Sequence, residues 1–181
     1  KGFTSQVEFD RDRAAHFAAV RAMFETMDVF VFTLGLTEGW RTKADKAMLP
    51  VCPGCGAGGD FDPEKYEFVN EKVSDVTTNL HEIVERIKSV NPSAKILLTV
   101  SPVPLVATYS SNHALTAITY SKSVLRAAVG EIYDSYDHVD YFPSYEIITG
   151  AYNRGAYFAD DLRSVKEDGV FHVMKLLFKH Y

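Results

Sequence analysis

The chain has 181 residues, a formal net charge of −5 and a pI near 5.7, and 46% of its residues are hydrophobic. This balance predicts one globular domain over residues 1–181 with a packed core, and it excludes a disordered chain. The acidic charge leaves no basic surplus to neutralise phosphates, and no apolar stretch reaches the ~18 residues that cross a bilayer. We therefore expect neither a nucleic-acid nor a membrane partner.

Four helical patterns alternate with three apolar runs along the chain. The first helix is predicted over residues 10–27, and its apolar face consists of Phe17, Val20, Phe24 and Met27. The run Val29–Leu34 follows and is typical of a strand buried on both faces of a parallel sheet. Residues 35–62 are irregular and rich in glycine, which is typical of a functional loop or lid.

The second helix has the most regular pattern, and Asn91-Pro92 ends it. Its apolar stripe consists of Val69, Val73, Val76, Leu80, Ile83, Val84 and Ile87. The remaining elements are, in order, a strand over Lys95–Val100, a helix over 114–136, a strand over Val139–Phe142 and a helix over 165–180. The core face of that last helix is predicted to be Val170, Val173, Met174 and Leu177.

Strands that alternate with helices predict an α/β fold, a three-layer sandwich with a flavodoxin-like parallel sheet. Such sheets usually contain about five strands, so we expect one or two further strands in a segment upstream of this chain. In an open parallel sheet the active site lies at the carboxyl ends of the strands. Three segments occupy those ends here, at residues 33–40, 101–113 and 144–165.

Five strings in chain order resemble the successive blocks of GSCFA-domain proteins, a family similar to the SGNH hydrolases: VFTLGLTEGW, NPSAKILLTVSPVPLVATY, TYSKSVLRAAV, VDYFPSYEI and YFADDLRSVKEDGVFHVM. The resemblance implies the SGNH type of parallel-sheet sandwich. It also implies a serine nucleophile in an N-terminal Gly-Ser-Cys-Phe-Ala block. That string is absent here, so we expect the chain to be a C-terminal fragment of the full domain, with the nucleophile upstream.

The segment after the first strand resembles the third SGNH block, in which an asparagine amide donates to the oxyanion. Thr37 stands at the asparagine position, and its hydroxyl is able to donate one hydrogen bond. Gly35, Glu38 and Trp40 beside it are assigned to substrate binding. The alternative is that Gly35 merely allows a tight turn, and that Thr37 and Glu38 cap the next segment.

The last SGNH block is Asp-x-x-His, in which the aspartate orients a histidine base. Asp161 stands at the aspartate position, but Ser164 takes the place of the histidine and is unable to act as a base near neutral pH. We expect Asp161 to hold Arg163, whose guanidinium suits a carboxylate or phosphate of the substrate, and Arg163 to pair with the Glu38 carboxylate. The residues expected to converge on one cleft are Gly35, Thr37, Glu38, His113, Asp161 and Arg163.

The loop after the second sheet strand supplies two further candidates. Ser101 ends that strand and is assigned to substrate binding, and His113 lies farther along the loop on the active face. His113 is the candidate general base. The alternative is that Asn112 and His113 begin the third helix.

Two other patterns are open to more than one interpretation. Ser121-Lys122 suits a Ser–Lys dyad, although their place in a predicted helix favours a helix-surface or capping role. Cys52 and Cys55 have the Cys-x-x-Cys spacing of redox and zinc sites, but zinc needs two more ligands and the loop is rich in glycine. We therefore assign no metal site, and two cysteines are too few for a disulfide framework, which favours a cytoplasmic location.

The leading functional hypothesis is an SGNH-like esterase or acyltransferase that acts on an acylated small molecule or glycan without a cofactor. The chain alone is expected to be inactive, because it lacks the nucleophile. The alternative is a catalytically inactive α/β module that binds a ligand or partner through the same face. A third reading is a thiol redox or metal protein built on Cys52 and Cys55. The sequence does not determine the oligomeric state.

Overall fold

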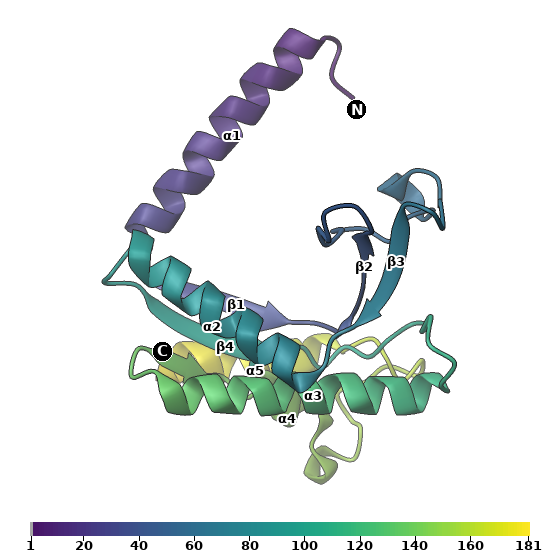
Figure 1. Cartoon of the computed structure of the whole chain (residues 1–181). Coiled ribbons are helices and arrows are strands. Elements are labelled where there is room, and N and C mark those ends of the chain that lie inside the picture. The colour runs from purple at the N-terminus through teal and green to yellow at the C-terminus, as the bar shows by residue number, and fades with distance from the viewer. Residues whose placement is uncertain (1) are drawn as a thin grey trace.

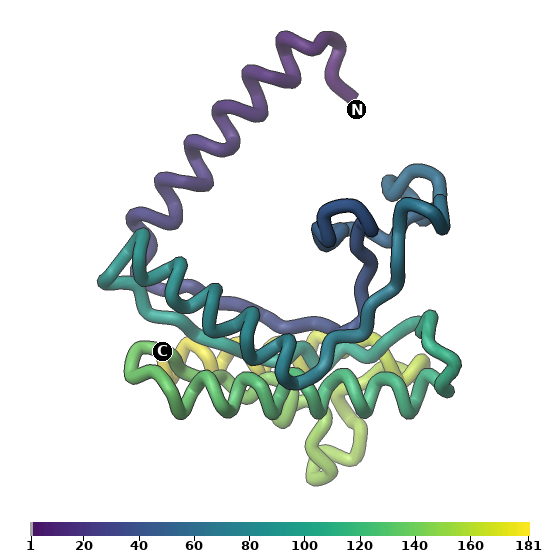
Figure 2. Tube along the Cα trace, in the orientation of Figure 1, coloured from purple at the N-terminus to yellow at the C-terminus, as the bar shows by residue number. Residues whose placement is uncertain are grey.

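The computed structural model describes residues 2–181, and Figures 1 and 2 show how the elements are arranged. The elements are, in order, α1 (Gln6–Thr26), β1 (Val29–Leu34), β2 (Glu38–Thr42), β3 (Tyr66–Asn70), α2 (Val73–Val90), β4 (Lys95–Val100), α3 (Ala114–Ser135), β5 (Val139–Tyr141), α4 (Ser144–Thr149) and α5 (Glu167–His180). Short 3₁₀ turns occupy Gly56–Gly58 and Ala151–Asn153. Within the described residues, no helix combines the length and apolar character that crossing a bilayer requires.

A parallel sheet of three strands forms the centre of the fold, in the order β1-β4-β5. Val29 lies opposite Lys95 and Leu34 lies opposite Val100, so the carboxyl ends of β1 and β4 are level. Helices α2 and α3 pack on one face of the sheet, and α4 and α5 lie against the other. The predicted α/β sandwich with adjacent parallel strands is therefore confirmed.

The main core lies between the sheet and the helix pair α2–α3 (Figure 1). Apolar residues of α2 recur at helical spacing and bury one stripe: Val76, Leu80, Val84 and Ile87. Asn91 ends this helix, and its amide donates to the carbonyl oxygens of Phe24 and Met27 at 3.2 and 2.8 Å. The same residue that stops α2 thus fixes the end of α1 beside the start of β4.

The outer strand β1 is buried on one face only. Phe30 and Phe32 pack on the core, whereas Val29 and Val31 on the other face are 51% and 53% exposed. The prediction that β1 is buried on both faces is wrong. Within residues 2–181 no strand pairs with the outer edge of β1, and α5 covers the side chains of Val29 and Val31 only in part. The central strand β4, by contrast, is buried from Ile96 to Val100.

The first and last helices bury less than their sequence patterns predict. No residue of α1 is buried, Phe17 is 61% exposed, and the helix projects away from the sheet so that only its C-terminal end lies near α2 (Figure 2). In α5 only Gly169 is buried, and Val170 is 50% exposed. The apolar residues predicted for α1 and α5 do lie on helices, but the other described residues cover them only in part.

A hairpin spans the irregular segment predicted after β1: residues 38–42 form its first strand, whereas residues 43–62 contain turns and one short 3₁₀ helix, as the glycine-rich pattern predicts. Strands β2 and β3 pair antiparallel, with Glu38 opposite Asn70. Val69 belongs to β3, and α2 begins only at Val73, so the predicted helical stripe started one turn too early. The four-residue spacing of Val69 and Val73 imitates a helix across the strand–helix boundary.

Candidate functional site

The turn after β1, residues Gly35–Thr37, is fixed by two side chains of α3. Lys122 Nζ donates to the Gly35 carbonyl at 2.7 Å, and the Thr37 amide donates to Ser121 Oγ at 2.9 Å. Ser121 and Lys122 are 1% and 2% exposed, so water does not compete for these bonds. We call this arrangement the turn clamp, and it holds the backbone at the carboxyl end of β1 in one conformation.

Lys122 carries an ammonium group in the protein interior. Burial lowers the pKa of Lys122 to about 8. Within residues 2–181 it forms no ion pair, and the Gly35 carbonyl is its hydrogen-bond acceptor. The expected helix-surface role of Ser121-Lys122 is therefore wrong, since both side chains lie on the buried stripe of α3 with Ala117, Val124, Leu125 and Ala128. The helical spacing of Ser121 and Lys122 from these apolar residues is the sequence signal that indicates their burial.

Thr37 is also buried, at 2% exposure, and its hydroxyl donates to Asn70 Oδ1 at 2.7 Å. A hydroxyl has one hydrogen to donate, so in this arrangement Thr37 orients Asn70. Within residues 2–181, Asn70 Nδ2 forms no hydrogen bond. Gly35 has ordinary backbone angles and open space where a Cβ would stand, so its contribution to the clamp is its carbonyl.

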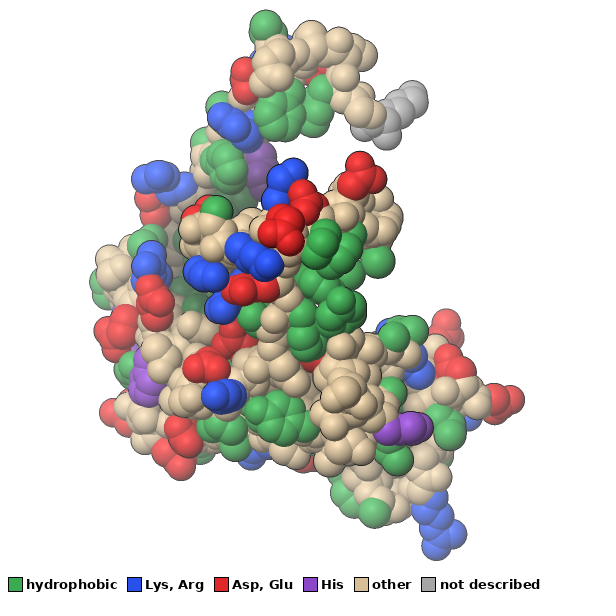
Figure 3. All heavy atoms as spheres, turned by 45° about the vertical axis from the view of Figure 1, so that its right-hand side comes forward, with side chains coloured by type: hydrophobic (Ala, Val, Ile, Leu, Met, Phe, Trp, Pro, Cys, Tyr) green, Lys and Arg blue, Asp and Glu red, His purple; other side chains and the backbone are tan. Residues whose placement is uncertain are grey.

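A cavity of about 420 Å³ opens beside the turn clamp, between the hairpin and the loop that follows β4. We call it the aromatic cavity; its lining includes Leu36, Glu38, Trp40, Phe68, Leu105 and Tyr109. The Trp40 ring lies edge-on to Tyr109 and Phe68, with centroid distances of 4.7 and 5.8 Å. Figure 3 shows hydrophobic side chains gathered on this side of the molecule. Segments from two strand ends therefore meet here. Of the residues expected to converge on one cleft, Glu38 alone is in the lining of this cavity.

The Glu38 carboxylate lies in the lining of the aromatic cavity. It accepts hydrogen bonds from Thr108 Oγ1 at 2.5 Å and from the Tyr109 amide at 3.4 Å. These bonds join the hairpin to the loop after β4. The predicted pair of Glu38 with Arg163 is wrong, because no ion pair within residues 2–181 joins them.

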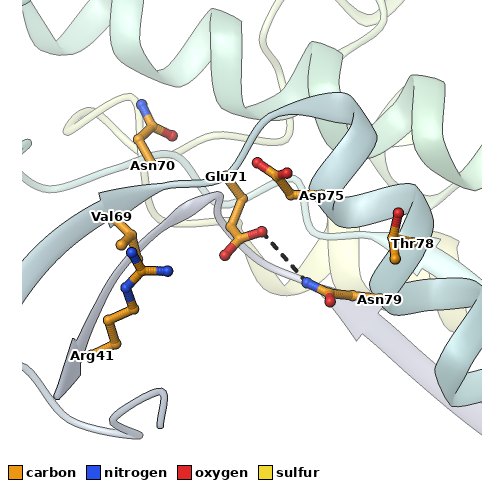
Figure 4. Close-up of a pocket in the computed structure, with 7 residues that line it drawn as sticks. All are labelled: Arg41, Val69, Asn70, Glu71, Asp75, Thr78 and Asn79. Carbon is orange, nitrogen blue, oxygen red and sulfur yellow. Dashed lines mark hydrogen bonds between the residues drawn. The ribbon is translucent and has the colours of Figure 1, made fainter. Parts of the chain in front are cut away.

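A second, polar pocket of about 450 Å³ lies at the junction of the hairpin and α2 (Figure 4). Its lining residues are Arg41, Val69, Asn70, Glu71, Asp75, Thr78 and Asn79. Burial and the nearby Asp75 raise the pKa of Glu71, and Asn79 Nδ2 donates to Glu71 at 3.4 Å. The side chain of Asn70 points away from Glu71, as alternation along a strand requires. Asn70 thus lines the polar pocket and also accepts the hydrogen bond from the Thr37 hydroxyl.

His113 is the residue immediately before α3. Its Nδ1 accepts a hydrogen bond from the Leu115 amide at 3.2 Å, so the alternative that it begins the helix is confirmed. The side chain is exposed. Ser101 lies at the carboxyl end of β4, where its amide donates to the Leu34 carbonyl at 2.9 Å and its Oγ accepts from Val103 N at 3.2 Å.

Asp161 organises the loop before α5. It accepts hydrogen bonds from the amides of Arg163 and Ser164 and from Ser164 Oγ, at 2.9, 2.8 and 2.6 Å. These bonds, that of the Ser164 side chain first, lower the pKa of Asp161 to about 2. Asp161 therefore holds the backbone of Arg163 and not its guanidinium. Arg163 Nε is buried without a hydrogen-bond partner, and no hydrogen bond within residues 2–181 joins either residue to Gly35–Trp40.

Cys52 and Cys55 are free, exposed thiols in the loop between β2 and β3. Desolvation and the neighbouring Cys55 raise the pKa of Cys52. A raised pKa reduces the thiolate fraction, which opposes nucleophilic or redox chemistry. Within residues 2–181 no group of three His, Cys, Asp or Glu side chains is placed to hold a metal ion.

The model of one protein family, described as the GSCFA family, matches residues 3–177. The chain belongs to the GSCFA family. The GSCFA match includes every residue of the turn clamp and of the aromatic cavity. No curated protein matches the sequence at a significant level.

Replacement Ser121→Ala tests the turn clamp. The change should lower the free energy of unfolding by about 1–3 kcal/mol, because the buried Thr37 amide loses its acceptor. Urea denaturation measures the effect. Ser123→Ala, an exposed position on the same helix, is the matched control and should stay within about 0.5 kcal/mol of wild type. Equal losses in the two variants would contradict the clamp.

Proposed function

We propose that this domain forms the substrate-binding and oxyanion-stabilising part of an SGNH-type esterase or acyltransferase that acts on an acylated small molecule or glycan. The turn clamp is the observation that carries the proposal. Oxyanion stabilisation requires donors held in place before the reaction, and two buried side chains of α3 fix the turn beside a cavity of substrate size.

The proposed roles follow from the contacts. Thr37 orients the carboxamide of Asn70, a residue that lines the polar pocket, and we assign Asn70 Nδ2 as the donor to the developing oxyanion. Glu38 and Trp40 belong to the wall on which the substrate rests, Gly35 lies in the adjoining turn, and Ser101 lies at the neighbouring strand end. Asp161 shapes the loop that carries Arg163, whose guanidinium forms no ion pair within residues 2–181 and suits an anionic group of the substrate.

His113 serves as the general base in this proposal only after a local change. Its Nδ1 accepts the Leu115 amide hydrogen, so the neutral ring carries its proton on Nε2. Release of this cap bond frees Nδ1 to accept a proton. The base step is therefore coupled to movement at the start of α3.

The nucleophile in this proposal comes from a segment that precedes the chain. Ser121 is buried and accepts the Thr37 amide, so it is committed to the clamp. A further parallel strand on the free edge of β1 would bring its carboxyl end beside Gly35–Thr37, since the ends of parallel strands align. The resemblance to SGNH hydrolases puts a serine there, within the Gly-Ser-Cys-Phe-Ala block.

The second candidate function is a ligand-binding module without catalysis. It is favoured by the aromatic cavity, whose lining contains no serine, lysine or histidine. Under this alternative the clamp stiffens the wall of a binding site and takes no part in a reaction.

An esterase assay distinguishes the two candidates. The chain alone should hydrolyse activated acyl esters at the background rate and resist labelling by a serine-directed phosphonate. The same chain extended upstream through a Gly-Ser-Cys-Phe-Ala block should exceed background by about a thousandfold or more, and Ser→Ala in that block should remove the gain. An extended protein that binds ligand without turnover would support the binding module. Phosphonate labelling of Ser101 or Ser121 would contradict the assignment of the nucleophile.

A further inference from the structure

The aromatic cavity presents ring surfaces from two separate segments. Trp40 and Phe68 come from the paired strands of the hairpin, where they lie opposite each other in register, and Tyr109 comes from the loop after β4. The Phe68 and Tyr109 centroids are 5.3 Å apart, and the Tyr109 side chain is 65% exposed. Leu36 and Leu105 complete an apolar lining that remains open to solvent.

A single carboxylate faces this apolar lining. Glu38 is partly buried, and its oxygens are oriented by Thr108 Oγ1 and the Tyr109 amide. Within residues 2–181 it has no cationic partner within 4 Å, and the cavity lining contains no lysine, arginine or histidine. The Glu67 carboxylate on the same hairpin is different, because it pairs with Arg41 and Lys46 at 2.5 and 3.1 Å.

An aromatic lining with one carboxylate that has no cationic partner within residues 2–181 favours one kind of ligand. A neutral acyl chain would cover the rings but would desolvate the Glu38 carboxylate without compensating its charge. An anion would be repelled by the same carboxylate. An organic ammonium group satisfies both features, because its charge pairs with the carboxylate while its carbon atoms contact the faces of the rings.

We propose that the aromatic cavity binds an organic ammonium group, with Glu38 as the counter-ion and Trp40, Phe68 and Tyr109 as the aromatic wall. This inference rests on the proposed function in one respect: it makes the ammonium group part of the substrate. The binding itself needs no nucleophile, so the two proposals can fail separately.

The test uses the only tryptophan of the chain, Trp40, as a fluorescence reporter. Choline and its neutral isostere 3,3-dimethylbutan-1-ol are titrated in parallel, because they differ in charge and hardly in shape. Choline should give a saturable change in Trp40 emission at a concentration about tenfold lower than the alcohol. Equal affinities, or no saturation with choline, would overturn the proposal.

Two variants and one control sharpen the experiment. Glu38→Gln keeps an acceptor for Thr108 and should abolish the preference for choline over the alcohol. Tyr109→Leu should weaken choline binding several-fold. Glu71→Gln changes a carboxylate of the polar pocket and should leave the titration as in wild type. Each variant is first checked for an unchanged thermal midpoint. Retention of the preference in Glu38→Gln would refute the assignment of the counter-ion.

Failure of the proposed catalysis and failure of the proposed cation site give different experimental results. Choline binding to a protein that shows no turnover even when extended upstream would remove the proposed catalysis and leave the cation site. Turnover of neutral acyl esters without any preference for choline would do the reverse.

Discussion

Between about pH 8 and pH 10.5, wild-type protein should gain about 3 kcal/mol in free energy of unfolding relative to Lys122→Met. The buried ammonium group has a pKa of about 8 in the folded protein, against 10.5 for an unperturbed lysine. Between these values the unfolded chain holds the proton and the folded protein does not, so the stability of wild type rises with pH. This gain in the free energy of unfolding of wild type is complete above pH 10.5 and is lost as the pH falls to about 8.

Chemical denaturation at a series of pH values measures this difference. Methionine keeps the length and apolar bulk of the side chain, and the other titrating groups cancel when the two curves are subtracted. Loss of the bond to Gly35 shifts the variant by a constant, whereas the titration changes the slope. Lys46→Met, at an exposed lysine of the hairpin, should follow the wild-type slope. Parallel curves for wild type and Lys122→Met would show that Lys122 is solvated.

Leu98→Ala should destabilise the protein by about 3 kcal/mol, with a range of about 2–5 kcal/mol. Leu98 is 0% exposed in the central strand and packs in the main core, so the change removes buried methyl groups and leaves a cavity. Urea or thermal denaturation followed by circular dichroism gives the value.

Val31→Ala is the matched control for Leu98→Ala. Val31 lies on the neighbouring strand β1 but is 53% exposed, so its truncation should cost less than about 1 kcal/mol. A loss at Val31 as large as that at Leu98 would mean that another surface covers β1 in solution.

The strand order was predictable because apolar runs alternate with helical patterns. The burial of β1 was not, since an apolar run shows which contacts a strand is suited to make and not whether those contacts are present. Val29 and Val31 illustrate the difference. The hairpin was missed for another reason: all five residues of β2 and of β3 are partly buried, so neither strand has the alternation that marks one buried face.

Sheet topology predicts where the site lies, but the sequence does not predict which side chains form hydrogen bonds there. Thr37 was placed at the correct strand end, yet its partners Ser121 and Asn70 lie 84 and 33 residues away. Contacts of this range leave no local pattern. Lys122 is expected on the helix surface because a charged side chain is usually exposed, although its place on the apolar stripe of the helix indicates the interior.

The hairpin leaves the sheet and returns to it at a single point. Glu38 pairs with Asn70, and the Glu71 amide donates to the Thr37 carbonyl at 2.9 Å, which closes the base of the excursion. Because both ends are fixed beside each other, a change in length or composition between them adds little loop-closure entropy and does not displace α2 or β4. Residues 43–65 are therefore free to vary between the paired strands, and because Leu49, Pro50 and Cys52 line the aromatic cavity, ligand preference is able to diverge there while the sheet keeps its packing.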